Sequence, residues 1–217
     1  MSSPPKQHPV LTEELIQNDG ARRFESRVFC DVRGQSVPLD LCRDCPFCIA
    51  VEDRDDRDSN WVHCSPPAEL VAAGPSAGAA LRRGAVVVDE TVLVRDVVAL
   101  FVEKGARMLV VADATGRAQG VVHESRLLRE IQAAAHRHQQ AMCLGWEAAA
   151  AEPASSVTST TVTVLESLPL REAVMRMATA HQRQVVVVDE RGYPVGLLLD
   201  VDALHGLRAK PPDDEES

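Results

Sequence analysis

The stretch VVVVDERGYPVGLLLDVD at residues 185–202 decides the fold, because the chain holds an earlier copy of the same pattern. Residues 109–126, which begin 76 positions before it, read LVVADATGRAQGVVHESR. Each copy has an apolar run, then Asp-x2-Gly-x3-Gly, then a second apolar run. Two Val-rich strands could match by coincidence, but coincidence does not explain an acid and two glycines at identical spacing. We conclude that the chain contains an internal repeat.

The match extends without a gap over residues 84–130 and 160–206. Each copy predicts a short strand, an amphipathic helix, a buried strand, a hairpin turn at the first glycine, a return strand and a closing helix. The helix stripes follow the i, i+3, i+4, i+7 rule: Val94, Val97, Val98 and Phe101, then Leu170, Ala173, Val174 and Met177. One such unit of about 50 residues has a marginal core. The predicted fold is therefore α+β, with two β-α-β-β-α repeats, 81–140 and 157–208, packed sheet against sheet as a pair.

This order resembles the CBS domain, and the tandem resembles a CBS pair, or Bateman module. The resemblance lies in two segments, VVVDETVLVRDVVALFVEKGARMLVVADATGRAQGVV (86–122) and VTVLESLPLREAVMRMATAHQRQVVVVDERGYPVGLLLDVDAL (162–204). It implies clefts between the repeats that often bind AMP, ADP, ATP or S-adenosylmethionine. It also implies that the chain forms a homodimer and regulates an attached domain or a partner protein.

The family's ligand signature, at the last strand and helix of a repeat, is Gly-h-h-Thr/Ser-x-x-Asp, where h is apolar. Its Asp bonds the ribose and its hydroxyl lies near phosphate. In the second repeat Asp202 matches the ribose position, whereas Leu199 replaces the hydroxyl. Thr160 and Thr161, before the first strand, are expected near phosphate. The alternative is that Asp202 only stabilises the first turn of its helix.

The first repeat departs further from this signature. Arg126 stands where the family has Asp, and His123 stands where it has Thr or Ser. The resemblance therefore implies that this repeat does not bind adenosine in the usual way. Arg126 or His123 could meet a phosphate by charge-assisted hydrogen bonds, or have no ligand at all.

Five of the six cysteines lie between residues 30 and 64. In a chain expected to be cytoplasmic, such clustering favours metal over disulfides. Four thiolates in tetrahedral geometry make a closed structural zinc site, so we predict a small zinc-ribbon-like module over residues 27–66. The predicted ligands are Cys30, Cys42, Cys45 and Cys64, with Cys48 as the alternative and His63 as a weaker one.

The spacing is not that of a regular zinc ribbon, which has two CxxC knuckles. Free thiols, a redox-sensing disulfide and an iron site therefore remain open alternatives. The sixth cysteine, Cys143, is expected to be a small hydrophobic residue away from the cluster.

The remaining segments give a domain plan. Residues 1–26 are expected to be flexible, with one short helix at Leu11–Gln17. Pro, Gly and Ala in residues 67–80 indicate a linker. Residues 141–156 are expected to connect the repeats irregularly, and residues 209–217 to form an acidic tail.

Composition narrows the function classes. The net charge of −9 disfavours nucleic acid, although Arg22, Arg23, Arg27 and Arg33 lie near the cysteines. No apolar run approaches the roughly 20 residues that span a bilayer, and the first residues show no secretory signal, which predicts a cytoplasmic protein without a membrane partner. No catalytic motif is recognisable, so no enzyme is expected. The sequence predicts a regulator that senses an adenosine compound; the alternatives are a dimerisation scaffold without ligand and, less favoured, a nucleic-acid-binding regulator.

Overall fold

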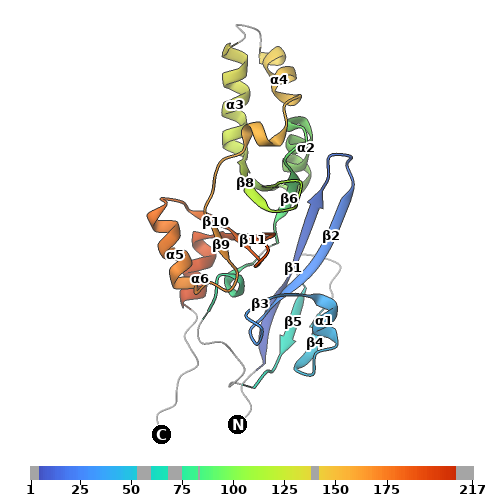
Figure 1. The fold of residues 1–217 in the computed structure, drawn as a ribbon, viewed down its shortest axis with the longest axis vertical. Coiled ribbons are helices and arrows are strands. Elements are labelled where there is room, and N and C mark those ends of the chain that lie inside the picture. Colours follow the sequence, from blue (N-terminus) through green and yellow to red (C-terminus); the bar gives the residue numbers. More distant parts are fainter. Residues whose placement is uncertain (1–4, 53–59, 68–74, 83, 138–141, 209–217) are drawn as a thin grey trace. The chain divides into compact units, whose positions relative to one another are not determined.

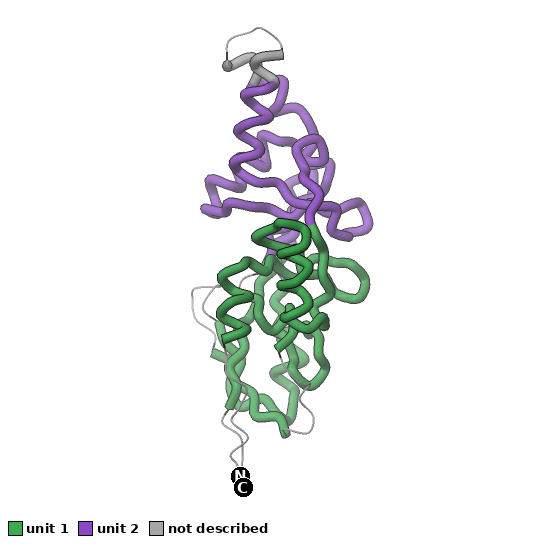
Figure 2. Tube along the Cα trace, turned by 90° about the vertical axis from the view of Figure 1, so that its left-hand side faces the viewer, with its two compact units in different colours: residues 1–13, 24–84, 162–217 green, residues 14–23, 85–161 purple. Residues whose placement is uncertain are grey.

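The computed structural model describes residues 5–52, 60–67, 75–82, 84–137 and 142–208. The predicted acidic tail 209–217 and part of the predicted linker, 68–74, lie outside these ranges. The chain divides into two compact units, shown in Figure 2. The first comprises residues 1–13, 24–84 and 162–217, and the second comprises residues 14–23 and 85–161.

The second unit holds the first repeat. Its elements are β6 (Val86–Asp89), α2 (Val94–Lys104), β7 (Met108–Ala112), β8 (Ala118–His123) and α3 (Glu124–Arg137). Strand β7 pairs parallel with β6 and antiparallel with β8. Helix α2 ends at Gly105, whose φ of 58° is left-handed. The apolar stripe of α2 packs into an aliphatic core with Leu109 and Val122. The predicted β-α-β-β-α order is confirmed here.

The first unit holds the second repeat, with the same order. Its elements are β9 (Thr163–Leu165), α5 (Leu170–Thr179), β10 (Gln184–Val188), β11 (Pro194–Leu199) and α6 (Asp200–Arg208). Strand β10 pairs parallel with β9 and antiparallel with β11. The two hairpin turns match closely: Gly116 has a φ of 84° and Gly192 one of 88°. Both repeats therefore fold as predicted.

A short lead-in segment precedes each repeat in sequence but packs in the other repeat's unit. The 3₁₀ turn η3 (Gly78–Ala80) lies in the first unit, where the amide of Ala77 donates to the carbonyl of Leu168 at 2.8 Å. The turn η4 (Ala154–Val157) lies in the second unit, where the amide of Ala154 donates to the carbonyl of Val92 at 2.7 Å. The prediction of a linker over 67–80 is thus wrong for its last residues, because Ala77 and Ala80 are buried.

The connection between the repeats is more regular than predicted. Helix α4 (Met142–Ala150) contacts α3, and Figure 1 shows the two helices side by side. The only residue of the connection outside the described ranges is 141. Among the described residues, no helix is long and apolar enough to cross a membrane.

The N-terminal residues form strands instead of a flexible segment. The elements are β1 (Lys6–Ile16), β2 (Arg22–Cys30), β3 (Gln35–Pro38), α1 (Leu39–Arg43), β4 (Cys48–Glu52) and β5 (Trp61–Cys64). The predicted helix at Leu11–Gln17 is wrong, because that stretch lies largely in β1. The first residues of β1 pair with β5, and its last three pair parallel with β6. Pairing on β1 therefore overrides the local helix preference.

Candidate ligand sites

The predicted ligand residues of the second repeat lie where β11 passes into α6. The amide of Asp200 donates to the carbonyl of Arg183 at 2.8 Å, which fixes the start of the helix. Leu199 ends β11 opposite Gln184, and Asp202 lies half-buried in the first turn of α6. The structure therefore brings Leu199 and Asp202 to one corner of the first unit.

An ion pair marks the outer side of this corner. Arg183 Nε donates to Asp200 Oδ2 at 2.7 Å, and this hydrogen bond lowers the pKa of Asp200. Arg183 is 86% exposed, so the pair is a surface contact of small value. Just before β9, the amide of Val162 donates to the side-chain oxygen of Gln182 at 2.9 Å. Asp200 is therefore the hydrogen-bond partner of Arg183. The predicted ribose ligand, Asp202, is a different carboxylate, two residues further along α6.

The matching corner of the first repeat carries cationic and neutral side chains. The amide of Glu124 donates to the carbonyl of Arg107 at 3.2 Å, as in the second repeat. His123 ends β8, and Arg126 lies in the first turn of α3. Burial, and then the charge of Arg126, lowers the pKa of His123, so the imidazole is neutral at pH 7. Within the described residues, the Nε of Arg126 is buried without a hydrogen-bond partner.

The two residues that are predicted to lie near phosphate belong to a different unit from Asp202. Thr160 and Thr161 are the last residues of the second unit, whereas Asp202 belongs to the first. Thr160 is exposed and Thr161 is half-buried. Leu199 and Asp202 therefore lie at one strand–helix corner in the first unit, and His123 and Arg126 lie at the matching corner in the second unit.

Comparison with models of known protein families shows which family the chain belongs to. The family model for the CBS domain matches residues 77–133 and again residues 154–209, together slightly more than half of the chain. The chain belongs to the CBS-domain family. Both CBS matches start at or next to a lead-in segment, so those segments are part of the CBS domains and not linkers.

Solved structures of CBS-domain proteins are similar to this chain, and the first two named here, with TM-scores above 0.5, share its fold. A CBS domain of a membrane protein from Sphaerobacter thermophilus is 22% identical with a TM-score of 0.52, over 63% of this chain and 90% of that one. A CBS-domain protein of unknown function from Kribbella flavida is 16% identical with a TM-score of 0.52, over 63% and 99%. A CBS-domain protein from Pyrobaculum aerophilum, complexed with AMP, is 26% identical with a TM-score of 0.46, over 58% and 88%. A search of curated proteins found no match to this chain.

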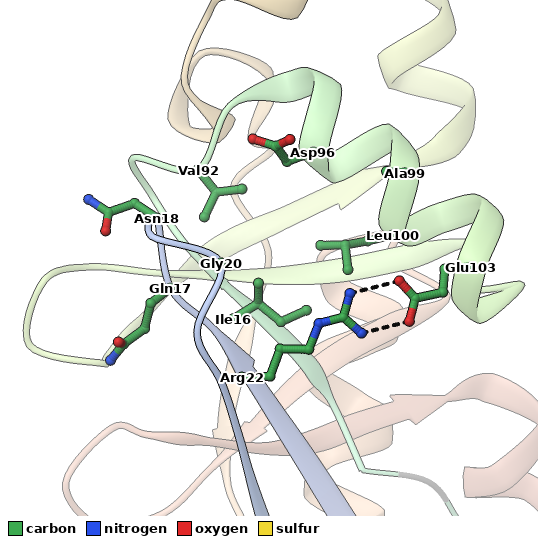
Figure 3. Close-up of a pocket in the computed structure, with 10 residues that line it drawn as sticks. All are labelled: Ile16, Gln17, Asn18, Gly20, Arg22, Val92, Asp96, Ala99, Leu100 and Glu103. Atoms are coloured by element: carbon green, nitrogen blue, oxygen red, sulfur yellow. Dashed lines mark hydrogen bonds and ion pairs between the residues drawn. The ribbon is translucent and has the colours of Figure 1, made fainter.

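A pocket that the sequence did not predict lies in the second unit, between the end of β1 and α2 (Figure 3). It has a volume of about 190 Å³, and its walls include Ile16, Val92 and Leu100. Arg22 closes one side with two hydrogen bonds to Glu103, at 2.6 and 2.8 Å. These bonds lower the pKa of Glu103 to about 2. The pocket is smaller than typical ligand sites of about 300–1,000 Å³, and we assign it no ligand.

The clustered cysteines gather in the N-terminal part of the first unit. Cys42 is buried in a small core with Val10, Val28, Val37 and Val62, and Cys30, Cys48 and Cys64 pack against that core. Burial, and then the charges of the other four thiolates, raises the pKa of Cys42 to about 12. The sequence prediction that these cysteines come together is therefore supported by their positions.

Among the residues that the structure describes, no group of three or more Cys, His, Asp or Glu side chains is placed so that it could hold a metal ion. His63, the weaker candidate ligand, contacts Glu52 at 3.0 Å. Zinc at the predicted set of Cys30, Cys42, Cys45 and Cys64 is therefore not confirmed.

Proposed function

We propose that this chain is a regulatory CBS pair that binds an adenosine nucleotide or derivative at its second repeat and signals its presence to a partner protein. The observation that carries the proposal is the position of Asp202. It lies in the first turn of the helix that follows β11, three residues after Leu199, where the family's ribose carboxylate stands. Regulation, and not catalysis, is the role that this family membership favours.

The chemistry of the corner favours a nucleoside over a free phosphate. A carboxylate accepts charge-assisted hydrogen bonds from the two ribose hydroxyls. Leu199 offers no hydroxyl to a phosphate, so that contact must come from other groups. Asp202 is therefore expected to dominate recognition, with the phosphate chain contributing less.

Thermal shift measurements with AMP, ATP and S-adenosylmethionine test the proposal. A ligand at 100 times its Kd stabilises the native state by about 2.7 kcal/mol, which raises Tm. Asp202→Ala should abolish that rise. Asp200→Asn is the matched control, because it removes a surface carboxylate two residues away that pairs with Arg183. A rise that survives Asp202→Ala would contradict the assignment.

A scaffold without ligand is the second candidate, and Leu199 and Arg126 support it because they replace signature residues in the two repeats. Helices α5 and α6 of the first unit carry exposed apolar side chains suited to a homodimer, Met175, Val201 and Leu204. No Tm rise with any of the three ligands, together with a dimer that Leu204→Glu converts to a monomer, would favour the scaffold. Native mass spectrometry measures both bound nucleotide and stoichiometry.

The zinc module stays a proposal of its own, supported by the chemistry of four clustered thiols. Its predicted ligands are Cys30, Cys42, Cys45 and Cys64. Metal analysis of the purified, gently handled chain tests it. About one zinc per chain would support the site, and a clearly lower content would contradict it.

A further inference from the structure

The register of one hairpin places two of the clustered cysteines directly opposite each other. Strands β4 and β5 pair antiparallel, and Cys48 is the cross-strand partner of Cys64. Opposed residues in antiparallel strands have Cα atoms about 4.5 or 5.5 Å apart. Disulfides join residues whose Cα atoms lie about 4.4–6.8 Å apart. The backbone is therefore already within the range that a disulfide requires.

The two side chains also share one face of the hairpin. Both Cys48 and Cys64 pack against the small core around Cys42 and Val62, so both point to the same side of the strands. Side chains of opposed residues on one face are close neighbours.

Both thiols are free and neither is fully buried. Beside Cys48, Ile49 is 60% exposed at the point where the ladder shifts register, so a small reagent can reach this end of β4. By contrast, Cys42 is 6% exposed inside the core. Cys30 and Cys45 are also only partly buried, so it is the cross-strand register that singles out Cys48 and Cys64.

We propose that Cys48 and Cys64 form a reversible cross-strand disulfide, which makes the β4–β5 hairpin a thiol modification site for low-molecular-weight disulfides. The site is separate from the nucleotide corner and does not rest on nucleotide binding. It uses Cys64, which is also a predicted zinc ligand, so the disulfide and the predicted zinc site exclude each other. The sequence offers five clustered thiols and does not show which two of them would form a disulfide. The register of β4 and β5 points to Cys48 and Cys64.

The exchange balances with the small disulfide as the oxidant. A Cys48 thiolate attacks one sulfur of the small disulfide, breaks its S–S bond and releases one thiolate. The Cys64 thiolate then attacks the Cys48 sulfur of this mixed disulfide and releases the second small thiolate. Two protein thiols are oxidised and one small disulfide is reduced to two thiols. The protons left by the cysteines go to the released thiolates.

The experiment uses the full chain, reduced with dithiothreitol, freed of reductant and then incubated with oxidised glutathione. Remaining thiols are alkylated and the chain is digested without reduction. Trypsin leaves Cys45 and Cys48 in one peptide, 44–54, and Cys64 in another, 58–82, and chymotrypsin cuts after Phe47 to separate the first two. We expect a linked peptide pair that contains Cys48 and Cys64, and its loss on renewed reduction.

The variants separate this pair from its neighbours. Cys48→Ser should abolish the link, whereas Cys45→Ser, the matched control from the same cluster, should retain it. Three results would overturn the proposal: a link between another pair such as Cys42 and Cys45, glutathione adducts without an internal link, or thiols that stay protected by bound zinc. Because the first readout uses the unaltered chain, poor folding of a variant would leave the test intact.

Discussion

The side chain of one aspartate shapes the hairpin turn in each CBS domain. Asp113 Oδ1 accepts the amides of Thr115 and Arg117, at 2.8 and 3.0 Å. Asp189 Oδ1 accepts the amides of Arg191 and Tyr193, both at 2.9 Å. The glycine three residues later supplies the positive φ that closes the turn. The Asp-x2-Gly pattern in both repeats thus encodes a turn with its own internal hydrogen bonds.

The second glycine of the repeated pattern has a packing role that can be tested at Gly120. A Cβ at this position would overlap the carbonyl oxygen of Ser159, which also accepts the amide of Val121 at 3.0 Å. Because this neighbour is backbone, it cannot rotate away. Gly120→Ala is therefore expected to lower the free energy of unfolding by about 2–3 kcal/mol. Urea unfolding measures the loss, with Gln119→Ala on the exposed neighbour as the control; equal stability of the two variants would contradict the packing role.

A buried carboxyl group at Glu13 links the first unit's stability to pH. Burial raises its pKa to about 8, because Arg27 only partly offsets the desolvation and the nearby Glu25, Asp189 and Glu166 raise the pKa further. The Oε1 atom has no hydrogen-bond partner among the described residues. Glu166, close by, is 3% exposed and accepts the amide of Ser36 at 2.8 Å, and burial raises its pKa as well. The cluster therefore holds more protons when folded than when unfolded.

The sign of the resulting pH dependence follows from this raised pKa. Between pH 4.5, the ordinary value, and about 8 the folded state keeps a proton on Glu13 that the unfolded state releases, so stability falls as pH rises. Glu13→Gln should remove much of that fall and stabilise the chain at pH 8 by roughly 2 kcal/mol. Unfolding curves from pH 5 to 8.5 measure it. The exposed Glu190→Gln serves as control, and an unchanged slope in Glu13→Gln would rule out this origin.

Strand β1 is an element that the sequence alone does not predict. The repeats, their element order and the hairpin turns could be predicted, because periodicity and glycines are local signals. The sequence predicts a short helix at Leu11–Gln17, yet Glu14 pairs with Val86 in the distant β6. The lead-in segments and the Cys48–Cys64 register were missed for the same reason: both depend on which distant strand or domain a segment meets.

The pairing of β1 with the first CBS domain brings a nearly buried ion pair with it. Lys104 Nζ, at the end of α2, lies 2.7 Å from Glu14 Oε2, and the Glu14 side chain is 8% exposed. Removing the cation would leave a buried carboxylate whose one remaining ion pair with a described residue is the longer contact to Arg22, at 3.5 Å. Lys104→Met is therefore expected to cost about 2 kcal/mol of unfolding free energy.

The matched comparison is Arg22→Met, which breaks the exposed pair with Glu103 and the longer contact with Glu14, and should cost less. Both variants are compared by urea unfolding at low and high salt. A buried pair is little screened, so the Lys104→Met loss should persist at high salt whereas the Arg22→Met loss should shrink. The opposite ranking would show that Glu14 is not stabilised by Lys104.

The N-terminal segment contributes to the cores of both CBS domains. Leu11 is 2% exposed and belongs to the core of the second CBS domain, with Leu170 and Leu198. Ile16, further along the same strand, belongs to the core of the first, with Val88 and Leu109. A segment that was predicted to be separate and flexible therefore supplies a strand and two core residues to the rest of the chain. Its loss would remove buried apolar area from both domains.

This sharing predicts that the chain unfolds as one cooperative structure. Its two tryptophans report on different parts, since Trp61 lies in β5 of the N-terminal segment and Trp146 packs against the core of the first CBS domain. The variants Trp61→Phe and Trp146→Phe each keep one tryptophan as the fluorescence reporter. In each variant, the urea transition seen by fluorescence should coincide with the transition seen by circular dichroism. Leu11→Ala should shift both transitions together by about 2–4 kcal/mol. An early Trp61 transition that leaves the Trp146 transition unchanged would mean that the N-terminal segment folds independently, and that β1 contributes little to the CBS cores.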